Sequence, residues 1–194
     1  ANIPILQEIT DKVSSKVREQ YEENPYPRWV NLTLHLSPKT VPQLSKELNI
    51  RIFDNAANNR PALNILIAGC GTGQHPIETA SRFKDCNVLA VDLSLSSLAY
   101  AKRKTQELGL QNIDYIQADI LDLGNLDKKF DIIESAGVLH HMDDPMAGWR
   151  VLTDCLESGG LMKIGLYSEL ARQHIVKMRE EIHQFHIGSS NNAM

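Results

Sequence analysis

Residues 63–74 read Leu-Asn-Ile-Leu-Ile-Ala-Gly-Cys-Gly-Thr-Gly-Gln, and this stretch decides the fold. An apolar segment, residues 63–68, has the character of a buried strand and runs directly into Gly-x-Gly-x-Gly. Glycine lets the backbone approach a ligand where any side chain would collide. The helix predicted to follow turns its unpaired N–H groups toward the same place. Residues 69–74 therefore predict a loop that holds a cofactor.

Strands and helices alternate on the C-terminal side of this loop. We expect further strands at residues 87–92, 113–117, 130–135 and 161–166. We expect helices at residues 76–84, from Ser94 to Gly109, from Asp144 to Gly159, and from Ser168 onward, the last turning Ile175, Met178, Ile182 and Phe185 inward. Repeated strand–helix pairs favour a parallel sheet. The predicted fold is α/β: a doubly wound, mainly parallel, Rossmann-like sheet of about five strands with helices on both faces.

An N-terminal helical extension precedes this sheet. Residues 3–22 repeat an apolar side chain every four positions and predict a helix that must end before Asn24-Pro25. A shorter helix is expected near residues 41–48. The polar loop at residues 55–61 is the best boundary between the two parts. We therefore expect an extension at residues 1–60, a cofactor-binding domain at residues 61–187 and a disordered tail at residues 188–194.

The bulk composition excludes several classes of protein. Hydrophobic residues make up 42% and charged residues 23% of the 194 residues, and the formal net charge is −4. An acidic chain has no electrostatic footprint for nucleic acid, so we expect no nucleic acid partner. No apolar run reaches ~18 residues, which predicts no membrane span. The first residues lack the pattern of a secretory signal, and we expect a cytoplasmic protein.

The three cysteines do not predict a metal site. Cys70, Cys86 and Cys155 are odd in number and widely spaced, and no zinc-ligand spacing is present. Cys70, between two glycines of the loop, is either a reactive thiol or a small residue tolerated beside the backbone. We expect no bound metal.

Acidic residues stand at the predicted ends of two further strands. Asp92 ends the second strand and Asp119 follows the third. Carboxyl ends of parallel strands are where ligands bind in open sheets. A carboxylate about 20 residues beyond a glycine loop suits a bidentate hydrogen bond to two ribose hydroxyls, and Asp119 can accept from an adenine amino group. Nicotinamide enzymes also have such loops, but their Gly-x-Gly-x-x-Gly places glycine where this chain has Gln74.

The joint pattern resembles class I S-adenosylmethionine-dependent methyltransferases over residues 63–167. The resemblance implies S-adenosyl-L-methionine as the cofactor, with S-adenosyl-L-homocysteine as its product. It also implies that the glycine loop holds the amino acid part of the cofactor, that Asp92 holds the ribose, and that Asp119 faces the adenine. The cofactor-binding residues implied are Gly69, Cys70, Gly71, Thr72, Gly73, Gln74, Asp92, Leu93, Asp119, Ile120, Ala136 and Val138. This chain departs from the family at Ile67, where members usually have an acidic residue.

Residues 20–29, QYEENPYPRW, are rich in aromatic residues and proline. The run is similar to a segment that precedes the methyltransferase domain in some bacterial proteins, several of which carry tetratricopeptide repeats. One hypothesis is a lid, in which an aromatic face covers the sulfonium cation and an arginine holds a carboxylate. The other is that the aromatic side chains only anchor the first helix to the sheet. The lid candidates are Tyr21, Tyr26, Arg28 and Trp29.

His140 and His141 follow the fourth predicted strand and are the candidate catalytic pair. Methyl transfer mainly requires alignment, with a base only if the nucleophile carries a proton. Histidine suits that task near neutral pH. The competing interpretation is that one ring packs locally while the other is solvated. Residues 136–141 are implied by the resemblance to line the methyl and substrate side.

The leading function is methyl transfer to a small molecule or a protein side chain. The alternative is a cofactor-binding regulatory or interaction module without turnover, because class I methyltransferases usually add two strands after the fifth and only nine residues follow Phe185. A nicotinamide-dependent oxidoreductase is a third reading that Gln74 disfavours. We expect the chain to be truncated and its fifth strand to be an exposed edge. A homodimer through that edge or through residues 170–185 is a prediction.

Overall fold

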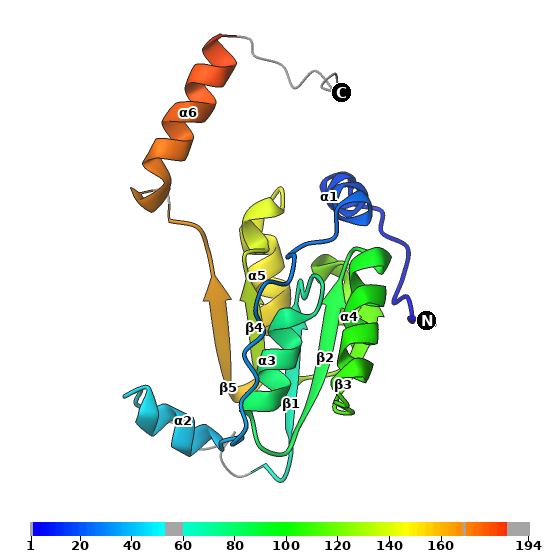
Figure 1. Cartoon of the computed structure of the whole chain (residues 1–194), viewed down its shortest axis with the longest axis vertical. Helices are drawn as coiled ribbons and strands as arrows, with labels where there is room; N and C mark the ends of the chain where they lie inside the picture. The colour runs from blue at the N-terminus through cyan, green and yellow to red at the C-terminus, as the bar shows by residue number, and fades with distance from the viewer. Residues whose placement is uncertain (1, 53–59, 169, 186–194) are drawn as a thin grey trace.

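The computed structural model describes residues 2–52, 60–168 and 170–185. Its centre is a parallel sheet of five strands, and Figure 1 shows their arrangement. The strands are β1 (Leu63–Ala68), β2 (Cys86–Asp92), β3 (Ile113–Gln117), β4 (Phe130–Ala136) and β5 (Leu156–Gly165). Their order is β3-β2-β1-β4-β5, and each neighbouring pair is parallel. The order reverses beside β1, which places a ligand crevice at the ends of β1 and β4. The predicted doubly wound α/β fold is confirmed.

Helices cover both faces because side chains alternate along each strand. On one face, Ile65 of β1 belongs to the same apolar cluster as Leu98 of α4 (Leu95–Glu107). On the other face, Leu66 packs in a cluster with Leu152 of α5 (Pro145–Asp154). The first face also carries α3 (Gln74–Arg82) and the second the 3₁₀ helix η2 (Ile120–Leu126). The four side chains named on the two faces, Ile65, Leu98, Leu66 and Leu152, are fully buried.

Local capping chemistry sets several helix ends as the sequence predicts. The Ser94 hydroxyl accepts from the Ser97 N–H at the start of α4, and the Asp144 carboxylate accepts from the Met146 N–H at the start of α5. Gly109 adopts a φ of +72° just after α4. Such left-handed backbone at a helix end is where glycine is least strained.

The first helix is shorter than predicted. It spans Lys12–Glu23 (α1), because the Asp11 carboxylate caps it by accepting from the N–H groups of Val13 and Ser14. The prediction of a helix from residue 3 is wrong. Residues 4–6 lie beside β3 instead, with the Leu6 N–H donating to the Gln117 carbonyl at 2.9 Å. The outer edge of β3 offers unpaired backbone groups that this segment satisfies. The second helix, α2 (Val41–Glu47), is where the sequence places it.

The junction between α5 and β5 also differs from the prediction. The helix ends at Asp154 rather than at Gly159, and β5 begins at Leu156 rather than at residue 161. The Phe130 N–H donates to the Cys155 carbonyl and Phe130 pairs with Leu156, so β4 draws this segment into the sheet. A register shift after that pair accommodates the extra residues, and Gly159 within it has a φ of +73°.

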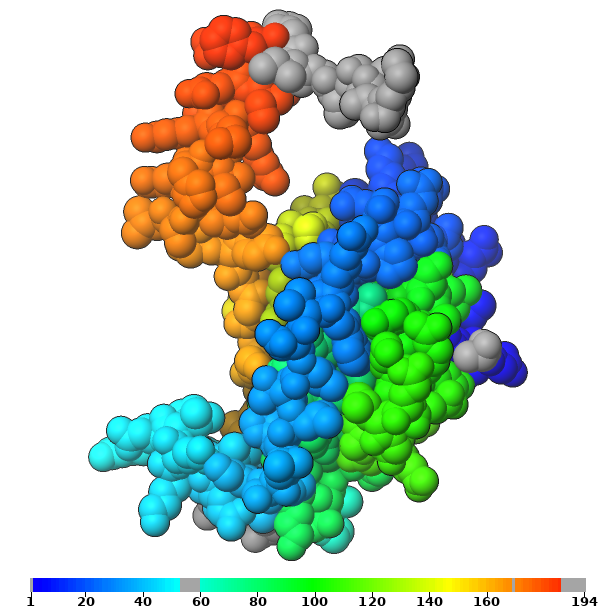
Figure 2. All heavy atoms as spheres, viewed as in Figure 1, coloured from blue at the N-terminus to red at the C-terminus, as the bar shows by residue number. Residues whose placement is uncertain are grey.

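The last helix does not turn its apolar side chains inward. It begins as a 3₁₀ turn, η4 (Leu170–Arg172), and continues as α6 (Gln173–Gln184), none of whose side chains is buried. Met178 is 60% and Phe185 71% exposed. Figure 2 shows α6, in orange, projecting from the body of the molecule. Within the described residues β5 pairs only with β4, so no further strand offers α6 a surface to cover.

Some predictions fall outside the described residues. The proposed boundary loop lies almost wholly within residues 53–59, and the predicted tail lies within residues 186–194, which are also outside the described chain. Across the described chain, no helix combines the length and the apolar character that crossing a bilayer requires.

Replacing Gly73 by Ala tests how closely α3 and α4 pack. A Cβ there would lie 2.5 Å from the Ala101 Cβ, at a φ of +94°. Gly109→Ala is the matched control, since its φ is also positive but a Cβ would meet nothing within 4 Å. We expect Gly73→Ala to cost about 1–3 kcal/mol more free energy of unfolding than Gly109→Ala, as measured by urea denaturation. Equal losses would contradict the close packing.

Candidate active site

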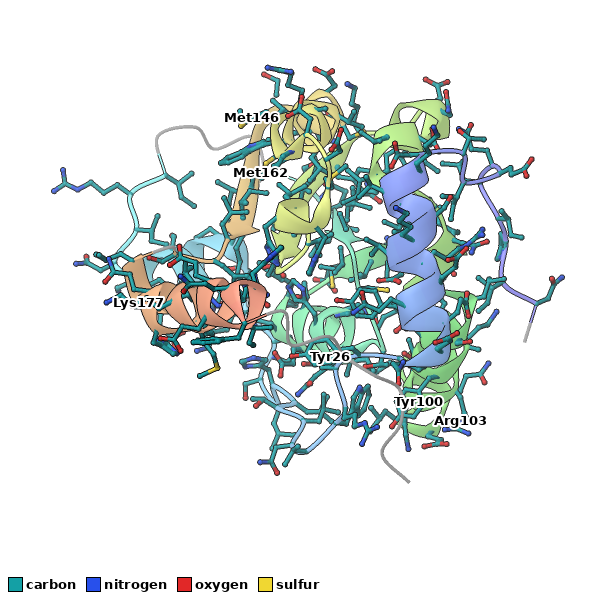
Figure 3. The ribbon with its side chains drawn as sticks, turned by 90° about the horizontal axis from the view of Figure 1, so that it is seen from above. Tyr26, Tyr100, Arg103, Met146, Met162 and Lys177 are labelled. Carbon is teal, nitrogen blue, oxygen red and sulfur yellow. The ribbon has the colours of Figure 1, made fainter. Side chains whose placement is uncertain are left out.

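A cavity of about 610 Å³ opens at the carboxyl ends of the strands. Figure 3 looks down on this end, with α1 and α6 on opposite sides of it. The volume lies within the range typical of small-molecule sites. The glycine loop forms one wall, and α1 contributes Ser14, Val17 and Tyr21 to another. The cavity therefore joins the N-terminal extension to the sheet.

The glycine loop is built for close backbone approach. Gly69 has a φ of +79°, and a Cβ on it would lie 2.3 Å from a methyl carbon of Val138. Gly71 has a φ of +52°, and its Cβ would lie 2.4 Å from the Tyr26 carbonyl oxygen. Both positions therefore require glycine on two counts, backbone conformation and space.

Asp92 ties the loop to the start of α4. Its carboxylate accepts from the Gly71 N–H at 2.7 Å and from the Ser94 N–H at 3.0 Å. Burial raises the pKa of Asp92, while these backbone N–H groups act in the opposite direction. A carboxylate has about four acceptor positions, so two stay available toward the cavity that Asp92 lines.

Asp119 lines the cavity next to the end of β3. It is buried, and its Oδ1 accepts from the Leu121 N–H at 3.0 Å, which starts η2. Within the described residues, its Oδ2 makes no hydrogen bond. This oxygen is the acceptor that the site offers to an amino group.

Most of the residues predicted to bind the cofactor line this cavity. They are Gly69, Cys70, Gly71, Gln74, Asp92, Leu93, Asp119, Ile120, Ala136 and Val138. Thr72 and Gly73 are not part of the lining. The Thr72 side chain is buried within the protein. Gly73, just before α3, packs closely against Ala101 of α4. The structure thus brings ten of the twelve predicted residues together, and their contacts with a cofactor stay a prediction.

The four lid candidates separate into two groups. Tyr21 and Tyr26 line the cavity, whereas Arg28 and Trp29 do not. Trp29 Nε1 donates to the Thr72 hydroxyl at 3.0 Å, and its ring meets Tyr100 edge to face at 5.7 Å. Arg28 is exposed. Trp29 therefore has the anchoring role that the sequence left as the alternative.

The extension is held to the glycine loop by further hydrogen bonds. The Thr72 N–H donates to the Tyr26 carbonyl at 3.1 Å, and the Thr72 hydroxyl donates to the Pro27 carbonyl at 2.6 Å. At the other end of this contact, the Glu22 carboxylate accepts from the N–H groups of Leu95 and Ser96. A carboxylate at the first turn of a helix is favourable, so Glu22 caps α4 from a distant segment.

His140 and His141 occupy different environments. His141 lines the cavity and meets the Tyr21 ring edge to face, with ring centroids 6.3 Å apart. His140 does not line the cavity, and its ring lies tilted by 39° against Tyr167, with centroids 4.0 Å apart. Neither ring nitrogen of His140 has a hydrogen-bond partner within the described residues. Burial lowers the pKa of both histidines. Neutral imidazoles can accept a proton, and only His141 faces the cavity.

Cys70 does not have the environment of a reactive thiol. It is buried, and burial raises its pKa well above the ordinary value, with the charge of Asp92 adding to the rise. A protonated thiol is a poor nucleophile. The structure favours the small buried residue among the two readings. The described residues contain no group of three His, Cys, Asp or Glu side chains placed to hold a metal ion.

Sequence reasoning missed a buried ionic cluster next to the loop. The Glu134 carboxylate, on β4, lies 2.7 Å from His75 Nε2 and accepts from the Thr79 hydroxyl at 2.7 Å. The Arg82 guanidinium and the Lys163 ammonium each lie 3.8 Å from its Oε1. Burial would raise the pKa of Glu134, but His75, Thr79 and Lys163 outweigh it and lower the pKa to about 2. Two acidic residues, Asp131 and Glu134, stand inside the apolar strand predicted at residues 130–135, and they were the available signal.

Other lining residues had no signal in the sequence, because distant segments bring them together. They are Ser14, Val17, Pro27, His75, Glu78, Ser97, Ala118, Met142, Lys163 and Tyr167, whereas Gly137 also lines the cavity and lies within the implied residues 136–141.

Comparison with known proteins shows what this arrangement resembles. Residues 65–160 match a family model described as a methyltransferase domain. An uncharacterized protein from Synechococcus sp. is 37% identical over 61% of this chain and 28% of its own length. A probable (S)-tetrahydroprotoberberine N-methyltransferase from Papaver bracteatum is 30% identical over 50% of the chain and 27% of its own length. A malonyl-[acyl-carrier protein] O-methyltransferase from Ilyobacter polytropus is 27% identical over 72% of this chain and 50% of its own length. The chain thus spans half or less of these relatives.

Solved structures agree with this assignment. An S-adenosylmethionine-dependent methyltransferase from Clostridium acetobutylicum superposes with a TM-score of 0.50 at 26% identity, over 64% of this chain and 46% of that one. Magnesium protoporphyrin IX methyltransferase from Synechocystis was solved with bound S-adenosylmethionine. It superposes with a TM-score of 0.52 at 19% identity, over 78% of this chain and 75% of that one. At that identity the second likeness supports the fold alone.

Replacing Glu134 by Gln tests the buried ionic cluster. The pKa of Glu134 falls from 4.5 to about 2 on folding, so its charge stabilises the native state above about pH 4.5. That contribution is lost as the pH falls toward 2. We expect the stability advantage of the wild type over Glu134→Gln to shrink by about 2 kcal/mol between about pH 6 and pH 3. Urea denaturation at both pH values measures it, and an advantage independent of pH would contradict the assignment.

Proposed function

We propose that the chain is a class I S-adenosylmethionine-dependent methyltransferase, which binds S-adenosylmethionine and transfers its methyl group. The acceptor we propose is a small molecule or a protein side chain. The observation that carries the proposal is the cavity at the strand ends, where the glycine loop, Asp92 and Asp119 meet. The relatives' names cover both N- and O-methyl transfer, so they do not choose the acceptor atom.

The residues present fit such a cofactor in charge and space. The backbone of the glycine loop can lie against the amino acid part, since neither Gly69 nor Gly71 has room for a Cβ. Asp92 has acceptor positions left for two ribose hydroxyls, and Asp119 Oδ2 can accept from the adenine amino group. Bound S-adenosylmethionine would supply a methyl group already activated by its positive sulfur.

The chain's own contribution would be alignment, desolvation and proton transfer. Residues of the glycine loop and the two aspartates would fix the cofactor, so that the acceptor approaches from the side of Ala136 and Val138. His141 lines the cavity with a lowered pKa, so it can accept a proton from the acceptor if one must leave. His140, outside the cavity, would support the position of His141 through ring contact at 4.3 Å.

The N-terminal extension would serve as the lid over this site. Ser14, Val17 and Tyr21 of α1 line the cavity from above the strand ends, and Tyr26 lines it beside the loop. An aromatic ring stabilises a desolvated cation by about 2 kcal/mol or less at most sites. We assign this role to Tyr21, and we assign to Trp29 the anchoring of residues 26–29 on Thr72.

A binding module without turnover is the second candidate. The observation that favours it is the edge of β5 that no other described strand pairs with, together with the exposed apolar side chains of Met178 on α6 and Phe185 just after it. The partner we propose for this surface is a second copy of the chain, because an unpaired strand edge pairs readily with its equivalent. Binding of S-adenosylhomocysteine without transfer of labelled methyl groups to any acceptor tested would favour this candidate. Light scattering would detect the dimer.

The first test is calorimetric titration with S-adenosylmethionine, S-adenosylhomocysteine and NADH. We expect micromolar binding of the first two alone, and Asp92→Asn to weaken it about tenfold or more. An amide has one acceptor oxygen, which cannot serve the Gly71 and Ser94 N–H groups and the ribose together. Asp114→Asn, at an exposed position of β3, is the control and should bind like the wild type. Unchanged affinity in Asp92→Asn would contradict the assigned role, and NADH binding would contradict the function.

Replacing Tyr21 by Ala tests the lid. We expect Tyr21→Ala to weaken S-adenosylmethionine by about five- to thirtyfold and S-adenosylhomocysteine by less, because only the first carries a sulfonium cation. Arg28→Ala is the control from the same segment, since Arg28 is exposed and outside the cavity. Equal losses for both ligands would contradict a cation–aromatic contact, and no loss would contradict the lid.

A further inference from the structure

A buried, ionised carboxylate lies directly behind the wall of the cavity. The Glu134 side chain is 4% exposed and does not itself line the cavity. It comes from β4, and Glu134 is in register with Ile67 of β1. Residues paired in register point to the same face of a sheet. The chain therefore carries its negative charge one strand away from Ile67, the apolar residue two positions before Gly69.

His75 connects this carboxylate to the cavity. It is the only residue in direct hydrogen-bond contact with Glu134 that also lines the cavity, within the part of the chain that the structure describes. Its Nε2 lies 2.7 Å from a Glu134 oxygen, and a carboxylate can only accept at that contact. Glu134 therefore fixes the proton on Nε2. In the neutral imidazole the lone pair is then on Nδ1.

Because His75 lines the cavity, its Nδ1 can serve there as an acceptor in a ring that an ionised carboxylate orients. A carboxylate hydrogen-bonded to one imidazole nitrogen orients the ring and fixes which nitrogen carries the proton. An Nδ1 acceptor of this kind suits a ligand that brings a positive N–H donor. Lys163, which also lines the cavity, carries a positive charge that can attract a ligand's carboxylate. The two groups together match a zwitterionic amino acid.

We propose that His75, positioned by Glu134, binds the ammonium group of the cofactor's amino acid portion. The inference rests on the proposed function, because it assumes a ligand of the S-adenosylmethionine type in this cavity. His75 is the contact residue, and Glu134 is a positioning residue that acts through it. Thr79 completes the arrangement by donating to the same carboxylate oxygen, Oε2, from the next turn of α3.

Two competing explanations must be separated from this one. The first is that the cluster only fastens α3 to β4, in which case the ligand's amine would not matter. The second is that Glu78, which lines the same cavity, holds the ammonium directly. A variant at each position and a ligand without the amine distinguish the three.

The experiment compares two ligands by calorimetry: S-adenosylhomocysteine and its deaminated analogue, in which hydrogen replaces the α-amino group. We expect the wild type to prefer the ligand with the amine by about tenfold or more, the size of a charge-assisted hydrogen bond. We expect His75→Phe to reduce that preference to within about twofold while its affinity for the deaminated analogue stays that of the wild type. His75→Lys keeps an N–H donor for Glu134 but has no acceptor, and should show the same loss if His75→Phe does not fold.

Each result bears on a different claim. Equal weakening of both ligands in the His75 variants would mean a purely structural cluster and would overturn the inference. Loss of the preference in Glu78→Gln, with the His75 variants unaffected, would overturn it in favour of Glu78. Both outcomes would leave the proposed function standing, since the wild type would still bind S-adenosylhomocysteine. Failure of the wild type to bind either ligand would overturn the proposed function and the inference together.

Discussion

The close approach of two backbone segments at Gly71 and Tyr26 is the constraint on which the site depends. Any side chain at Gly71 would collide with the Tyr26 carbonyl, and that same carbonyl accepts from the Thr72 N–H. The extension can therefore lie on the loop only because the loop has no side chain there. Without this contact the cavity would lose the wall that α1 and residues 26–27 provide. The glycine loop thus has two contacts: one side lines the cavity, and the other side packs against the chain's own N-terminal segment.

Carboxylates around the site are matched to backbone N–H groups rather than to arginine or lysine. Asp92 accepts from the N–H groups of Gly71 and Ser94, and Asp119 accepts from the Leu121 N–H. Glu22 accepts from the Leu95 N–H at the start of α4. Helix starts favour negative charge, so these acids are held without consuming a cation. Glu134 is the exception, with His75 as its neighbour and two cations nearby. The difference separates acids that shape the cavity from an acid that acts through another residue.

The sequence predicts the sheet well because buried parallel strands are continuous apolar runs. Residues 63–68 and 113–117 are strands within the predicted bounds, and Asp92 and Asp119 meet at one edge as parallel order requires. Its failures lie where a distant partner decides the conformation. Residues 4–6 join β3 rather than α1, and residues 156–160 join β4 rather than α5. The Glu134–His75 contact joins positions 59 residues apart, and the packing of α3 against the sheet brings them together.

The contact between Glu22 and α4 has a consequence for how the chain folds. It spans 73 residues of sequence, and such non-local contacts are slow to form because a long loop must close first. During synthesis, α1 emerges before the sheet on which it rests. The helix must therefore wait, with its apolar side chains exposed, until β1, β2 and α4 have formed. Completion of the cavity is thereby a late event in folding, and the ability to bind a ligand reports on a finished native state.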